Sequence, residues 1–213
     1  MKKIRTLIQS AILATALLGS TQSAKSAEVK GSLEVLAGDK ATTTDLKVST
    51  RFSEDFSLFA RNRIENPYQK ASVPLTLIDL NYDLNKNLSV FTEGLFTQKD
   101  GSIGRLGWSY NNKIGKFNFL YLNIFDLKDK PSVDLHPIVS YSYRLNDRWN
   151  AFTQLEVLSN LDLQKGNHNF TSERARLGLE YKGFKFGIGA DLKQTGNKFK
   201  QVHNYGGFIS KNF

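Results

Sequence analysis

The chain has 213 residues, of which 40% are hydrophobic and 23% charged, and its formal net charge is +9. It contains no cysteine, which excludes disulfides, thiolate metal sites and cysteine nucleophiles. Its three histidines leave little material for a histidine metal centre, so we expect no metal and no cofactor. The positive charge alone would favour nucleic acid or an anionic surface as a partner.

The first 27 residues have the order of a secretory signal peptide. A short basic segment (1–5) precedes an apolar stretch (7–18), and small and polar residues follow (19–27). The apolar stretch is too short to span a bilayer as a helix. We expect residues 1–27 to be removed and residues 28–213 to form one domain. This removal takes away four basic residues and no acid, so the formal charge falls from +9 to +5. An exported chain rarely meets DNA, so we expect no nucleic-acid partner.

After residue 27 the sequence alternates between apolar and polar residues with period two. In one such segment Leu46 and Val48 alternate with Asp45 and Lys47. This alternation predicts strands that have two different faces. The expected strands, in chain order, cover residues 28–37, 44–53, 56–65, 74–83, 88–98, 102–110, 116–127, 135–145, 148–158, 172–182, 184–193 and 199–213.

Short connections alternate with longer ones along the chain. The short connections are rich in Asn, Asp and Gly, which tolerate tight turns, and lie at 53–55, 83–87, 111–115, 146–148 and 182–183. Most of the other six, among them Ser159–Thr171, are longer and more polar. Even strand numbers with turns on one side and loops on the other are typical of outer-membrane barrels. The sequence therefore predicts an all-β, antiparallel up-and-down transmembrane barrel of twelve strands, or ten if 74–83 or 116–127 is misread, with short periplasmic turns and longer outer loops.

Aromatic residues gather at the strand ends, mostly beside the short turns. They are Tyr82, Trp108, Tyr110, Tyr143, Trp149 and Tyr181. This placement favours a girdle at the membrane interface, and the alternative is that these rings only staple hairpins. Tyr205, Ile209 and Phe213 share one face of the last strand, which resembles the carboxy-terminal signature that the barrel-insertion machinery reads in bacterial outer-membrane barrels. Lys211 departs from the apolar residue usual at that position.

If the apolar face of each strand meets lipid, most basic residues face inward. The candidate pore-lining and anion-binding residues are Arg51, Arg61, Arg63, Arg105, Arg144, Arg174, Arg176 and Lys185. A twelve-stranded barrel has a backbone radius of roughly 12 Å and a lumen on the order of 10 Å wide. Arginine rows in such a lumen favour anions. The alternative is that the arginines pair with inward acids, which are Glu34, Asp45, Glu65, Asp79, Glu93, Glu156, Glu180 and Asp191, and fill a closed interior.

These features together resemble the small monomeric porins for acidic oligosaccharides, of the oligogalacturonate and sialic-acid type. The resemblance is architectural and implies two arginine tracks facing each other across the pore, here Arg61/Arg63 and Arg174/Arg176. We therefore expect a monomeric, non-enzymatic outer-membrane channel of a Gram-negative bacterium that passes small anionic solutes. Its other expected partners are outer-membrane lipid and lipopolysaccharide.

Two other hypotheses stay open. One is a plugged structural or adhesion barrel that acts through outer loops such as Ser159–Thr171. The other is a lipid-modifying barrel enzyme with a Ser–His pair. His136 and Ser140 share a strand face, but their offset of roughly 13 Å is too long for a hydrogen bond.

Overall fold

The computed structural model describes residues 28–98 and 101–213, and every regular element in these two ranges is a β-strand. The expected signal peptide, residues 1–27, lies outside the described residues. Within residues 28–98 and 101–213 no helix is long and apolar enough to cross a membrane.

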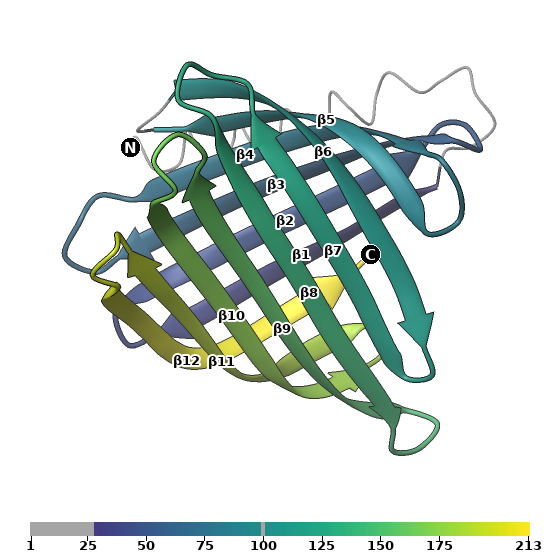
Figure 1. Cartoon of the computed structure of the whole chain (residues 1–213). Coiled ribbons are helices and arrows are strands. Elements are labelled where there is room, and N and C mark those ends of the chain that lie inside the picture. The colour runs from purple at the N-terminus through teal and green to yellow at the C-terminus, as the bar shows by residue number, and fades with distance from the viewer. Residues whose placement is uncertain (1–27, 99–100) are drawn as a thin grey trace, which may run out of the picture.

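Twelve strands form one closed antiparallel barrel (Figure 1). They are β1 (Val29–Gly38), β2 (Ala41–Arg51), β3 (Phe56–Pro67), β4 (Val73–Asp83), β5 (Leu88–Thr97), β6 (Gly101–Ile114), β7 (Phe117–Asp126), β8 (Ser132–Arg144), β9 (Trp149–Asp162), β10 (His168–Tyr181), β11 (Phe184–Thr195) and β12 (Lys200–Asn212). Each strand pairs with its sequence neighbours, and β1 pairs with β12 to close the ring. The predicted up-and-down barrel is confirmed with twelve strands, not ten.

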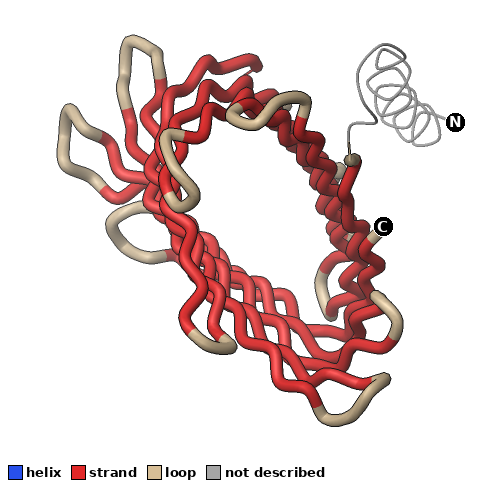
Figure 2. The backbone as a smooth tube through the Cα atoms, turned by 90° about the vertical axis from the view of Figure 1, so that its right-hand side faces the viewer, coloured by secondary structure: helices blue, strands red, loops and turns tan. Residues whose placement is uncertain are grey.

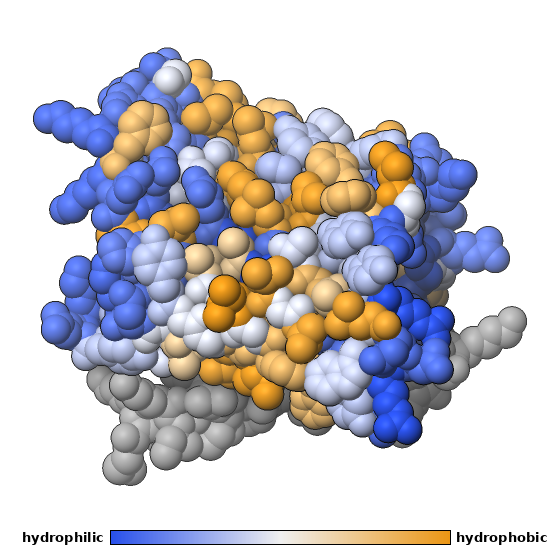
Figure 3. Space-filling model, turned by 90° about the horizontal axis from the view of Figure 1, so that it is seen from below, coloured by the Kyte–Doolittle hydropathy of each residue, from blue (hydrophilic) through white to orange (hydrophobic). Residues whose placement is uncertain are grey.

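The period-two alternation separates an apolar outer surface from a charged interior. Between β9 and β10 the register sets Glu156 opposite Arg174 and Leu155 opposite Ala175. Glu156 and Arg174 are buried inside the barrel, whereas Leu155 and Ala175 are exposed on its outside. Figure 3 shows one face of the molecule, where apolar residues lie across the middle and hydrophilic residues gather at the two ends. This surface suits a lipid bilayer around the middle of the barrel.

The barrel is oval in cross-section, as the view in Figure 2 shows. β3 and β9 lie six positions apart around the ring in either direction, so they are opposite walls. In a circular barrel these walls would lie roughly 24 Å apart. Here Arg61 on β3 and Glu156 on β9 are close enough for a direct ion pair of 3.0 Å. The lumen is therefore narrower at this level than the circular geometry predicts.

The connections are shorter than the sequence suggested. The expected loop over 159–171 is wrong in its bounds, because β9 and β10 continue pairing as far as Leu161 and His168 and leave only residues 163–167 between them. Similarly, β6 extends to Ile114, past the end expected at 110. In both places polar residues within a strand resembled a loop. The connections at the expected outer end have two to five residues, against two to four at the other end.

A charge on the outer surface should destabilise the barrel in a depth-dependent way. Leu155→Arg places a guanidinium near the middle of β9, facing out, and we expect it to cost about 2–4 kcal/mol. Leu163→Arg, in the connection after β9, should cost about 0–1 kcal/mol. Denaturant unfolding of the two variants in lipid vesicles measures the difference. Equal costs would contradict the assignment of this surface to lipid.

Candidate functional site

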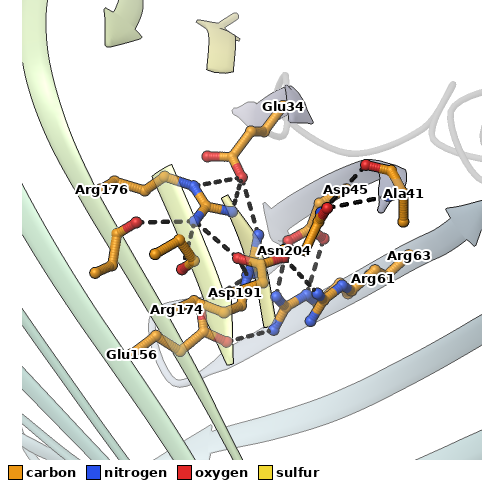
Figure 4. A network of polar contacts seen from close by, with 12 residues as sticks. Glu34, Ala41, Asp45, Arg61, Arg63, Glu156, Arg174, Arg176, Asp191 and Asn204 are labelled. Atoms are coloured by element: carbon orange, nitrogen blue, oxygen red, sulfur yellow. Dashed lines mark hydrogen bonds and ion pairs between the residues drawn. The ribbon is translucent and has the colours of Figure 1, made fainter. Parts of the chain in front are cut away.

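A network of ion pairs crosses the interior of the barrel at mid-height (Figure 4). Arg61 donates from Nε and Nη2 to the two carboxylate oxygens of Asp45 at 2.9 and 2.7 Å, and from Nη1 to Glu156 Oε1 at 3.0 Å. The two-point contact with Asp45 is the fork geometry that only arginine offers. Arg61 thereby links β2 and β3 to the opposite wall at β9.

The arginines of β10 complete this network. Arg174 donates from Nη1 to Asp45 at 2.7 Å and to Glu156 at 3.2 Å, and from Nη2 to Glu34 at 2.9 Å. Arg176 contacts Glu34 through Nε and Nη2, and Asp191 through Nη1 at 2.8 Å. Each guanidinium thus has at least two carboxylate partners.

Two further cations belong to the same network. Arg63 donates to Asp191 at 2.9 Å, and Lys47 Nζ lies 3.9 Å from Asp45 Oδ2. We call these nine residues the mid-barrel network: Glu34, Asp45, Lys47, Arg61, Arg63, Glu156, Arg174, Arg176 and Asp191. It contains five cations and four carboxylates, so its formal charge is +1. Arg61/Arg63 and Arg174/Arg176 meet in one charge-compensated cluster instead of facing each other as separate tracks.

A second cluster lies near the expected outer end, on the wall formed by β4–β8. Arg105 donates from Nη1 to Glu93 at 2.7 Å, lies 2.9 Å from Asp126 through Nε, and also contacts Asp134. Lys128 Nζ lies 2.6 Å from Asp126 Oδ2. We call these residues, together with Asp79, the Arg105 cluster. It holds two cations and four carboxylates.

Asp79 is the least compensated member of the Arg105 cluster. It lies directly opposite Glu93 in the pairing of β4 and β5, and both side chains are buried. Its Oδ1 is buried and has no hydrogen-bond partner within the described ranges. Two carboxylates therefore face each other with one guanidinium, that of Arg105, nearby.

The other predicted pore-lining residues lie apart from these clusters. Arg51 pairs with Asp83 at 2.6 Å and Arg144 with Asp147 at 2.5 Å, both at the short-turn rim. Lys185 Nζ lies 5.2 Å from the ring centroid of Phe152. His136, which we considered as half of a Ser–His pair, places Nε2 3.1 Å from Glu156 Oε1.

Part of the interior was not predicted from the sequence. Leu36, Phe152 and Phe208 face inward as a small apolar core, with the two phenyl rings 5.9 Å apart, because we assigned all apolar positions to lipid. Asp126 and Asp134 were also missed, because they lay at an expected strand end and in an expected loop. The period-two pattern could have identified Asp126 and Asp134, because both occupy alternate positions that face inward in their strands.

The aromatic residues lie on the outer face toward the short-turn end, often in ring pairs. Tyr82 packs on Phe56 at 4.9 Å between ring centroids, and Trp149 on Tyr181 at 4.7 Å. Trp108 packs on Tyr121 at 5.4 Å. Such pairs stabilise neighbouring strands whatever surrounds them, so the interfacial girdle that also includes Tyr110 and Tyr143 stays a prediction. Tyr205, Ile209 and Phe213 are all exposed on the outside of β12 and its end, and their role as an insertion signal likewise stays a prediction.

These features define a closed, twelve-stranded transmembrane β-barrel whose interior is charged and largely self-compensated. Among solved structures the chain is similar to the KdgM porin, with a TM-score of 0.51 and 14% identity over 86% of this chain and 99% of that one. It is also similar to the NanC porin, with a TM-score of 0.52 and 14% identity over 87% of this chain and 99% of that one. A structure described as the KdgM porin in complex with disordered oligogalacturonate has a TM-score of 0.50, again with 14% identity over 86% of this chain and 99% of that one. At this identity the similarity establishes the fold.

No protein-family description matches the sequence, and no curated protein matches it either.

Two aspartates of the interior should respond in opposite ways to the same substitution. Asp45→Asn removes a buried charge that Arg61 and Arg174 both contact, and we expect it to destabilise the barrel by about 3–5 kcal/mol. Asp79→Asn removes a buried carboxyl group that faces Glu93, so that Arg105 no longer serves both acids, and should raise stability by about 1 kcal/mol. Denaturant unfolding in vesicles measures both. A loss of stability in Asp79→Asn as large as in Asp45→Asn would contradict the difference in charge compensation.

Proposed function

We propose that the protein is an outer-membrane channel for the passive diffusion of small solutes, with a preference for anions. The observation that supports this most directly is the closed barrel with an apolar outside and a hydrophilic inside, because such a shell separates lipid from a polar passage. The resemblance to porins of the same architecture supports the same conclusion.

Part of the lining in the short-turn half of the lumen suits water. Small uncharged polar side chains occupy inward positions of many strands there: Ser49, Ser57, Asn81, Ser89, Ser109, Ser140 and Gln154. These side chains offer hydrogen bonds to a passing solute and its water, with no fixed charge. This half of the barrel resembles a vestibule that leads to the mid-barrel network.

The ion pair between Arg61 and Glu156 narrows this passage at mid-height. This ion pair joins opposite walls. Arg174 lies on the side of the lumen that is formed by β10, β11, β12, β1 and β2. Solutes must therefore pass along the wall formed by β4–β8, where they meet the Arg105 cluster toward the expected outer end, or displace the ion pair. The same ion pair supports the second candidate function, a closed structural barrel. The version that acts through long outer loops has less support, because residues 159–171 are mostly strand.

The preference for anions rests on the excess cation of the mid-barrel network. The four arginines are matched by four carboxylates, so Lys47 supplies the net positive charge at the constriction. A fixed charge beside a narrow passage attracts counter-ions and raises their share of the current.

The cellular setting of the proposal rests on several features. The signal-peptide pattern of residues 1–27 supports export, and the outward aromatic rings support insertion into a bacterial outer membrane. Outer-membrane lipid and lipopolysaccharide would then surround a single barrel, and the barrel-insertion machinery would place it there.

Single-channel recording of the refolded protein tests the channel. We expect stable open currents, with a reversal potential under a salt gradient that favours anions. A folded barrel, identified by heat-modifiable gel mobility, that passes no current would support the closed structural barrel instead.

Removing the transverse ion pair should widen the passage. The double variant Arg61→Ala with Glu156→Ala deletes both partners, so that it avoids leaving one buried charge unpaired, and we expect about a twofold increase in single-channel conductance. Arg144→Ala with Asp147→Ala removes an exposed pair at the rim and serves as the matched control. Unchanged conductance in the first variant would show that the Arg61–Glu156 pair does not limit the passage.

Neutralising Lys47 should reduce selectivity without disturbing the arginines. Lys47→Gln brings the mid-barrel network to zero charge, and Lys47→Glu to −1. We expect the reversal potential to move toward zero in the first variant and to change sign in the second. Lys182→Gln, in the turn between β10 and β11, is the control. A reversal potential that is the same in all four proteins would contradict this origin of selectivity.

A further inference from the structure

A cavity of about 300 Å³ opens at the short-turn end of the barrel, away from both charged clusters. Its lining comes from the turn between β4 and β5, the end of β6 and the start of β7. The lining residues are Lys86, Asn87, Asn111, Asn112, Lys113 and Asn118. We call this cavity the rim pocket.

The rim pocket exists because one hairpin extends beyond its neighbour. The pairing of β5 with β6 ends at Leu88 opposite Tyr110, but β6 continues to Ile114, paired only with β7. Asn111 lies beside the turn at 84–87, residues 112–114 project past it, and the space between this segment and the turn is the rim pocket.

Hydrogen bonds hold both sides of the rim pocket in place. Asn85 Oδ1 accepts from the backbone N–H groups of Asn87 at 2.9 Å and Leu88 at 3.0 Å, which fixes the turn. Asn87 Nδ2 donates to the Asn111 carbonyl at 2.6 Å, and the Asn111 N–H donates to the Asn87 carbonyl at 2.8 Å. The turn and the projecting strand are thus joined before any ligand arrives, which lowers the entropic cost of binding.

The rim pocket has positive charge and no carboxylate, unlike the two charged clusters of the interior. Its lining holds two lysines and no carboxylate. Within the described ranges neither Lys86 nor Lys113 makes an ion pair, a hydrogen bond or a cation–π contact. Other lysines at this end have partners, since Lys116 lies 3.9 Å from the ring centroid of Tyr143 and Lys211 lies 4.0 Å from that of Phe184. The two ammonium groups of the rim pocket are therefore available to a ligand.

We propose that the rim pocket binds a small hydroxylated anion, with a carboxylate or phosphate at the lysines and its hydroxyl groups at the asparagine amides. An ammonium group forms charge-assisted hydrogen bonds with such acids, and an amide both donates and accepts, as a hydroxyl requires. The volume is at the lower limit of ligand sites and suits a unit the size of one sugar ring. Lys113 and Asn118 keep the inward parity of β6 and β7, so the rim pocket lies at the mouth of the lumen. The inference rests on the proposed channel in one respect: it takes the ligand to be a solute that enters or leaves the lumen at the rim pocket.

Calorimetric titration of the refolded protein in detergent micelles tests the site, with glucuronate as the probe and glucose as its uncharged match. We expect glucuronate to bind and glucose to bind at least tenfold more weakly. The variant Lys86→Gln with Lys113→Gln should bind glucuronate about tenfold more weakly than the wild type. Lys182→Gln with Lys211→Gln, which removes two partnered lysines from the same end, should bind as the wild type does. All four substituted lysines are at the barrel rim, and heat-modifiable mobility verifies that each variant is folded.

Each outcome of this titration decides the proposal. Absence of glucuronate binding to the wild type, equal binding of glucose, or equal loss in both double variants would overturn it. Because the titration requires no current, it is independent of the channel. Binding by a barrel that passes no current would refute the channel and leave the rim pocket, whereas current without binding would refute the rim pocket alone.

Discussion

The ion pair between Arg61 and Glu156 is the interaction on which the shape of the interior depends. It joins β3 to β9, which are opposite walls of the ring, and it bridges the narrow dimension of the oval barrel. Arg174 shares both carboxylate partners of Arg61 and fills the space on one side. At mid-height this network occupies one half of the lumen, and a passage along the other half leads past the Arg105 cluster.

Burial explains why the charges of this network are so closely matched. A charge taken out of water destabilises a protein unless partners replace the lost solvation, and removing a single partner leaves the other uncompensated. The carboxylates Asp45 and Glu156 are each reached by two guanidinium groups, and Arg176 by two carboxylates. The network therefore connects opposite walls through ion pairs and has one excess positive charge. Arginines without carboxylate partners would each contribute a full positive charge to the lumen.

The sequence was sufficient for the fold because alternation is a local property. Each strand reveals its two faces through its own residues, and turn residues mark many of its ends, so strand number and topology followed without tertiary information. The interior was harder to predict, because pairing depends on the separation of opposite walls. Nothing near Arg61 in the sequence indicates that Glu156, 95 residues away, lies within 3.0 Å of it. Some strand ends were predicted wrongly because polar residues such as Asn111 and Ser159 lie within strands. A polar residue that pairs in a sheet cannot be told from a loop residue by its type alone.

Paired and unpaired cations have different roles in this barrel. The arginines of the mid-barrel network donate their hydrogen bonds to neighbouring carboxylates. They therefore affect the shape of the lumen more than its electrostatic potential. Lys86 and Lys113 have no such partners within the described ranges, and they lie at the mouth, where salt screens charges beyond roughly 8–10 Å. Their attraction is therefore short-ranged and acts on a solute already at the rim pocket. It follows that the positive charge of the sequence is a poor guide to anion recognition, and that the availability of each cation in the folded barrel is the better one.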